Sequence, residues 1–166
     1  KNIKRVDAAR YFYLYHYGGV YIDLDFVCLK SMDNLLKNKE IVLGQLEDIN
    51  HPQSIPNAIM ISKPRDKFWM YVINKLPARM NKGNPESDTG PIFLTRCVKE
   101  YNKNNNKSNI TLLNSNYFYP IDWTTQKGQK YRKNIPSDLK KEFPDSYFVT
   151  FWTSSWRNNN KLKNLN

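Results

Sequence analysis

The chain has 166 residues, 40% of them hydrophobic, and a formal net charge of +11 from 26 Lys and Arg against 15 Asp and Glu. These values predict one globular domain and exclude a disordered chain, and the basic surplus favours anionic partners such as nucleic acid, phosphates or nucleotide sugars. No apolar run reaches the roughly 18 residues of a membrane span, and Cys28 and Cys97 are too few for a disulfide scaffold or a four-cysteine zinc module.

The pattern of apolar residues predicts alternating helices and strands. Helices are expected over residues 3–17, from about 63 to 76 and from about 89 to 103. Strands are expected over residues 20–22, 40–46, 57–61, 110–113 and 147–152, and a loop over 78–88. This alternation predicts an α/β domain with a mainly parallel central sheet, in which ligands collect at the carboxyl ends of strands.

Two acidic residues, Asp23 and Asp25, follow the first expected strand. Residues two apart in a strand point the same way, so the two carboxylates can converge on one site. Converging carboxylates repel each other unless a cation lies between them, and oxygen ligands suit Mg²⁺ or Mn²⁺. By itself, however, an Asp-x-Asp pair is more typical of a solvated turn.

A second polar pair, Asp7 and Arg10, lies three residues apart on one face of the first expected helix. Taken alone, it is typical of a surface salt bridge that contributes little to stability. An arginine also offers a planar fork of donors that suits a phosphate or sugar oxygen.

These pairs belong to a longer pattern with fixed spacings. Asp7-x-x-Arg10, followed by Gly18-Gly19-Val20-Tyr21-Ile22-Asp23-Leu24-Asp25, resembles the DXD-containing sugar-binding region of glycosyltransferase family 32. That family includes initiating mannosyltransferases and α1,4-glycosyltransferases. Further motifs resemble it in the same order: Asn57-x-x-Met60 with Pro64, Thr89-Gly90-Pro91, Phe118-Tyr119-Pro120 with Trp123, and Trp152-x-x-Ser155-Trp156.

The resemblance implies a GT-A type glycosyltransferase fold. The family's nucleotide-binding strand and helix would precede Lys1, so residues 1–156 are expected to be a fragment of one catalytic domain. Residues 157–166 are expected to form a basic, Asn-rich tail. A chain of residues 1–166 alone is therefore expected to bind a donor weakly.

The resemblance also implies a function: transfer of a sugar from a nucleotide-sugar donor to a glycan or protein acceptor, with Mn²⁺ or Mg²⁺ and retention of anomeric configuration. It makes Asp25 a metal ligand, with Asp23 reaching the metal through water or contacting a sugar hydroxyl. Arg10 would contact a phosphate or sugar oxygen, and Asp7 the donor sugar. The remaining expected substrate contacts are Gly19, Tyr21, Asn57, Gly90, Ser155 and Trp156.

One position departs from the family pattern, because Thr150 stands where a histidine is usual. A hydroxyl is a weaker metal ligand than imidazole. We expect Thr150 near Asp25 and Ser155, and Thr150→His to raise metal affinity.

Two alternatives stay open: a basic nucleic-acid-binding module, and a degenerate transferase fold that binds nucleotide sugar without turnover. The sequence also leaves the compartment open, with the Golgi lumen and the cytoplasm both compatible, and its Asn and Lys richness fits a viral or protist source.

Overall fold

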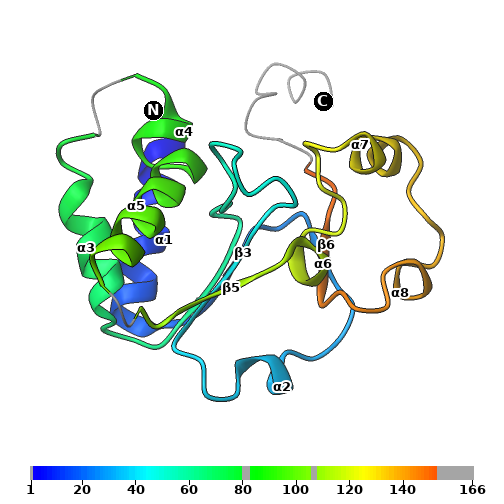
Figure 1. The fold of residues 1–166 in the computed structure, drawn as a ribbon, viewed down its shortest axis with the longest axis horizontal. Coiled ribbons are helices and arrows are strands. Elements are labelled where there is room, and N and C mark those ends of the chain that lie inside the picture. The colour runs from blue at the N-terminus through cyan, green and yellow to red at the C-terminus, as the bar shows by residue number, and fades with distance from the viewer. Residues whose placement is uncertain (1, 80–82, 106–107, 153–166) are drawn as a thin grey trace, which may run out of the picture.

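The computed structural model describes residues 2–79, 83–105 and 108–152 (Figure 1). Its helices are α1 (Asn2–Tyr17), α2 (Asp33–Leu36), α3 (Lys67–Lys75), α4 (Pro85–Asp88), α5 (Pro91–Asn104), α6 (Ser115–Phe118), α7 (Gln126–Lys133) and α8 (Leu139–Glu142). Its strands are β1 (Gly19–Ile22), β2 (Phe26–Cys28), β3 (Ile41–Gly44), β4 (Ile59–Ser62), β5 (Ile110–Leu113) and β6 (Phe148–Thr150). None of the helices in these ranges is long and apolar enough to cross a membrane.

The strands form a four-stranded sheet in the order β1-β4-β3-β5 and a two-stranded sheet of β2 and β6. The α/β class is confirmed, but the expectation of a mainly parallel sheet is wrong. Strand β4 runs antiparallel to both β1 and β3, and β3–β5 is the one parallel pair in the four-stranded sheet as described. The cause is the link between β3 and β4, which is a loop without a crossover helix, so the chain returns antiparallel.

Both faces of the four-stranded sheet are covered, which is why β3 and β4 are buried throughout. Helices α1, α3 and α5 pack together on one face, and α6 with β6 lies towards the other (Figure 1). Ile41 and Leu43 of β3 join the helical side of the core, whereas Val42 between them joins the aromatic side with Phe118 and Phe148. The alternation of strand side chains thus separates the core into two layers.

The turn between α1 and β1 requires glycine. Gly18 has a φ of +65°, and a Cβ there would lie 2.6 Å from the Pro64 nitrogen and 2.8 Å from the Ser62 carbonyl oxygen. The next residue, Gly19, has a φ of +88° but open space around it. The close approach at Gly18 fixes the end of α1 against the end of β4, and so fixes α1 relative to the acidic segment after β1.

We predict that Gly18→Ala destabilises the fold more than Gly19→Ala. The left-handed backbone costs about 1–2 kcal/mol for alanine at either position. Gly18→Ala adds the clash with Pro64 and Ser62, for an additional loss of about 1–3 kcal/mol. Urea unfolding of both variants measures the difference, and equal losses would show that Pro64 moves away at no cost.

Candidate active site

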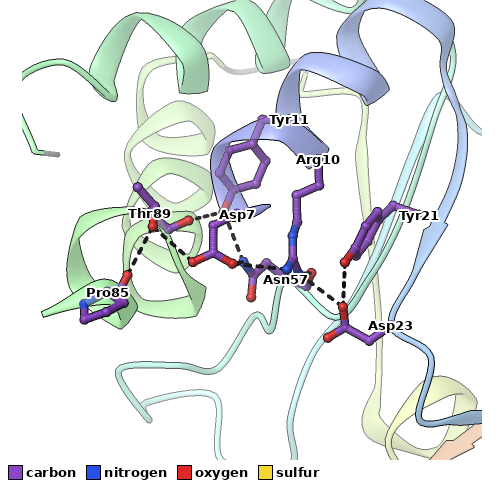
Figure 2. A network of polar contacts seen from close by, with 8 residues as sticks. All are labelled: Asp7, Arg10, Tyr11, Tyr21, Asp23, Asn57, Pro85 and Thr89. Carbon is purple, nitrogen blue, oxygen red and sulfur yellow. Dashed lines mark hydrogen bonds and ion pairs between the residues drawn. The ribbon is translucent and has the colours of Figure 1, made fainter. Parts of the chain in front are cut away.

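Arg10 is the centre of a buried polar network that begins on α1 (Figure 2). Its Nη2 lies 3.2 Å from the Oδ1 of Asp7, one helical turn earlier, and its Nη1 donates to the carbonyl of Asn57 at 2.6 Å. Arg10 and Asp7 are each only 5% exposed. Because it is buried, the pair is not the solvated salt bridge that the spacing alone allows. A buried ion pair also needs further hydrogen bonds from the surrounding chain.

Asp7 joins α1 to two segments that are distant in sequence. Its Oδ1 accepts from the Asn57 side-chain amide at 3.0 Å, and its Oδ2 accepts from the Thr89 hydroxyl at 3.0 Å. The Tyr11 hydroxyl donates to the Thr89 carbonyl at 2.7 Å, which closes the group. These bonds bring together α1, the residues before β4 and the residues before α5.

Asp23 is held at the opposite side of Arg10. Arg10 Nη1 lies 3.4 Å from Asp23 Oδ1, and the Tyr21 hydroxyl donates to the same oxygen at 2.6 Å. The Arg10 guanidinium also lies 4.4 Å from the centre of the Tyr21 ring, within cation–π range. Asp23 Oδ2 receives none of these bonds from the described residues, so it is the oxygen that is placed to meet a ligand.

Burial dominates the electrostatics of this network. It raises the pKa of Asp7 and of Asp23, although the positive charge of Arg10 opposes the rise in both. Burial also raises the pKa of Tyr21, so its hydroxyl keeps the proton that it donates to Asp23. Two carboxylates share one guanidinium, and the site therefore carries surplus negative charge when both are ionised.

The network opens on a cleft of about 760 Å³. One wall contains Asp7, Arg10, Tyr21, Asp23, Asp25 and Asn57. Asp25 is half-buried, and its charge contributes to the raised pKa of Asp23, so the two carboxylates are close enough to interact. Both residues line the cleft, but they lie in the turn after β1 and not in the strand itself, so their convergence stays a prediction.

The wall fits a divalent cation of the Mg²⁺ or Mn²⁺ type. No group of three or more His, Cys, Asp or Glu that could hold a metal occurs among the described residues. Mg²⁺ in phosphate-transfer sites is commonly held by one or two carboxylates, with water and phosphate oxygens as the other ligands. Asp25 and the Oδ2 of Asp23 match that pattern.

The other side of the cleft comes from the second half of the chain, with Trp123, Arg132 and Trp152. Trp152 has a φ of +54°, a conformation that costs a non-glycine residue roughly 1–3 kcal/mol. Its indole N–H donates to the Ile121 carbonyl at 2.6 Å, and its ring stacks on Tyr119 with 5.2 Å between centroids. These contacts hold the indole in place against the strain.

Sequence reasoning did not assign this second wall, although Trp123 and Trp152 stand inside motifs that resemble the family. It also missed Gln53 and Glu86, which line the cleft and share a hydrogen bond of 2.7 Å from the Gln53 amide. No spacing in the sequence marks Arg132, Gln53 or Glu86.

Two expected substrate contacts do not line the cleft. Gly19 is an exposed β1 residue paired with Ser62. Gly90 begins α5, and a Cβ there would lie 2.9 Å from Glu86 Cα, so the turn before α5 needs glycine for packing. Ser155, Trp156 and the tail at 157–166 lie outside the described residues.

Thr150 lies next to the acidic segment but faces the core. It pairs with Phe26, the residue after Asp25. We expected this late strand to lie beside β1, but in the structure it is β6 and pairs with β2. Directly opposed residues share a face of the sheet, and Phe26 packs on Phe148 and Tyr119. Thr150 is 1% exposed and its hydroxyl accepts from the Trp152 N–H at 3.2 Å, which indicates a structural role.

Comparison with known proteins agrees with this geometry. A family model for the glycosyltransferase sugar-binding region containing the DXD motif matches residues 1–42, which hold Asp7, Arg10, Asp23 and Asp25. A second model, the alpha 1,4-glycosyltransferase conserved region, matches residues 62–165. The chain belongs to glycosyltransferase family 32.

Several of its relatives have a lipid in their names. The chain is 38% identical over 105 residues to inositol phosphoceramide mannosyltransferase 1 of Schizosaccharomyces pombe, covering 60% of this chain and 32% of the relative. It is 30% identical over 169 residues to inositol phosphoceramide mannosyltransferase 2 of the same yeast, covering 95% and 41%. It is 29% identical over 153 residues to mouse lactosylceramide 4-alpha-galactosyltransferase, covering 88% and 40%.

The chain thus spans less than half the length of each of these three relatives. No solved structure gives a significant match to it.

The raised pKa of Asp7 predicts a pH-dependent effect of Asp7→Asn. Folding raises the pKa of this carboxyl above its usual value of 3.8. Its contribution to the free energy of unfolding is therefore largest below pH 3.8, and it is lost as the pH rises through the pKa of the folded state. The unfolding free energy of the wild type, relative to Asp7→Asn, should therefore fall as pH rises above 3.8.

Urea unfolding across this pH range measures the effect. Asp145→Asn, at an exposed position outside the cleft, controls for the loss of one negative charge. A difference between wild type and Asp7→Asn that grows with pH would mean that Arg10 outweighs burial at Asp7.

Proposed function

We propose that this chain carries the catalytic core of a glycosyltransferase that moves a sugar from a nucleotide-sugar donor to the sugar or head group of a glycan or lipid acceptor. One observation carries the proposal: Asp23 is fixed by Arg10 and Tyr21 beside Asp25, in a cleft of about 760 Å³, within a family 32 chain. The lipid acceptors in the names of the relatives support the acceptor class.

In this reaction the bond between the anomeric carbon and the diphosphate oxygen breaks, and the nucleoside diphosphate leaves. The acceptor hydroxyl oxygen forms the new glycosidic bond to that carbon and releases its proton. Asp25 and Asp23 would hold a divalent cation, Mn²⁺ or Mg²⁺, which supplies positive charge beside the leaving diphosphate. Retention of anomeric configuration is part of the proposal on the strength of the family.

Arg10 acts on this chemistry through Asp23. It is nearly enclosed by Asp7, Asp23, the Asn57 carbonyl and the Tyr21 ring, and its two Nη groups contact the protein. Its Nε is also buried and has no hydrogen-bond partner among the described residues. We therefore assign Arg10 as a positioning residue, in place of the phosphate contact expected from its residue type. Asp7 lines the cleft with fixed oxygens, and hydroxyls of the donor sugar are the donors that suit them.

The threonine at position 150 supports a second candidate function, that of a transferase fold that binds nucleotide sugar without turnover. The family usually has a histidine here, and in this chain the side chain is buried and bonded to the Trp152 backbone. Binding of donor without transfer or donor hydrolysis, in the full-length protein, would support this candidate over the first.

We predict that Mn²⁺ or Mg²⁺ strengthens nucleotide-sugar binding to the full-length protein, and that Asp25→Ala removes this gain. Loss of a first ligand should lower the metal-dependent affinity roughly ten-fold or more. Calorimetry with UDP- and GDP-sugars, with metal and with EDTA, measures the effect.

Asp145→Ala provides the matched control for this test, since it removes an exposed carboxylate outside the cleft. Equal donor affinity with metal and with EDTA in the wild type would show that Asp25 is not a metal ligand. A gain that survives in Asp25→Ala would show the same.

A further inference from the structure

The two sides of the cleft differ in charge. The wall from α1 and β1 carries Asp7, Asp23 and Asp25, with Arg10 enclosed among them. The second half of the chain contributes Trp123, Arg132 and Trp152 to the lining of the same cleft. The lining of this cleft therefore offers an anionic ligand a second guanidinium besides Arg10, from a different part of the chain.

Among the described residues, Arg132 is a cation of the cleft lining that pairs with no carboxylate. Its Nε donates to the Phe151 carbonyl at 3.1 Å and its Nη2 to the Trp152 carbonyl at 3.0 Å. Within the described ranges no carboxylate forms an ion pair with it, whereas Arg10 pairs with both Asp7 and Asp23. The Nη1 group of Arg132 donates to none of the described residues.

The two carbonyl bonds hold this guanidinium in one orientation. The carbonyls belong to the two residues that follow β6, and Trp152 is itself fixed by Ile121, Tyr119 and the Thr150 hydroxyl. An exposed arginine normally loses much rotamer freedom when it binds a ligand. Here part of that freedom is already lost in the protein, so the remaining donors, chiefly Nη1, are held ready for an anion such as phosphate.

We propose that Arg132 binds a phosphate oxygen of a ligand in the cleft, with Trp123 and Trp152 beside it as ring surfaces for the attached sugar. The proposal rests on the transferase function proposed above and names the chemistry that this wall recognises, a phosphate ester joined to a polar ring. Two substrates offer that chemistry. One is the diphosphate of the nucleotide-sugar donor, and the other is the phosphodiester of an anionic lipid head group.

The test compares matched ligands with and without phosphate, by calorimetry on the full-length protein. UDP and GDP are compared with uridine and guanosine, and glycerophosphoinositol with myo-inositol. The variants are Arg132→Gln and Arg132→Lys, and the control is Lys133→Gln, which removes a charge from an exposed neighbour on α7 outside the cleft.

We expect Arg132→Gln to reduce the preference for the phosphate-bearing member of one pair by roughly ten- to a hundred-fold, as for loss of charge-assisted hydrogen bonds. The pair that changes identifies the source, donor or acceptor. Arg132→Lys keeps the charge without the fork, and should reduce the preference less than Arg132→Gln but measurably. If Arg132→Gln fails to fold, an unchanged preference in Arg132→Lys overturns the proposal.

A phosphate preference in Arg132→Gln equal to that in Lys133→Gln, for both pairs, overturns the proposal. So does a wild type that binds neither phosphate ligand better than its neutral partner. The transferase proposal fails separately, if no sugar is transferred from any nucleotide sugar while the Arg132-dependent preference persists. If sugar transfer does not depend on Arg132 and no phosphate preference is found, the transferase proposal holds and the proposal for Arg132 is wrong.

Discussion

The site depends on one buried guanidinium shared by two carboxylates. Arg10 contacts Asp7 and Asp23 while it is only 5% exposed, and breaking such a group by removing its cation costs about 3–5 kcal/mol. One positive charge does not balance two negative ones, and burial raises the pKa of both carboxyls. Asp25 adds a third carboxylate beside them. The protein therefore maintains a place where a further cation is electrostatically favoured, and this is the condition that a metal-dependent transferase requires.

The hydrogen bonds of the buried group come from segments that are distant in sequence and pack against α1. Asn57 supplies a carbonyl to Arg10 and an amide to Asp7, and Thr89 supplies a hydroxyl to Asp7. Neither segment is regular where it makes these contacts: one precedes β4 and the other precedes α5. The strands and helices position these short segments, and the tight approach at Gly18 sets the distance between α1 and β4. Packing at one end of α1 thus determines polar geometry at the other.

The sequence alone predicts the helices and strands that local residue patterns determine. The helix that carries Asp7 and Arg10, the strand before Asp23, and β5 were predicted within one or two residues. The direction of β4 was not, because an antiparallel return depends on a loop with no periodic signal. Arg132 was missed for a related reason. Its partners are backbone carbonyls of residues about twenty positions later, and backbone groups are the same in every sequence. Motifs pointed to the acidic residues, and also include Trp123 and Trp152, whereas tertiary contacts alone place Arg132 in the cleft.

A tyrosine of the core, Tyr119, links parts of the cleft lining that are distant in sequence. Tyr119 is fully buried, packs against Phe26 immediately after Asp25, and stacks on Trp152. Its hydroxyl donates to the carbonyl of Pro56, next to Asn57, at 3.5 Å. One ring therefore contacts both walls, and interiors packed at crystal-like density transmit a change in such a ring to everything that it touches. A change in the packing of Tyr119 would therefore affect both Trp152 and the segment that precedes Asn57, which line the same cleft.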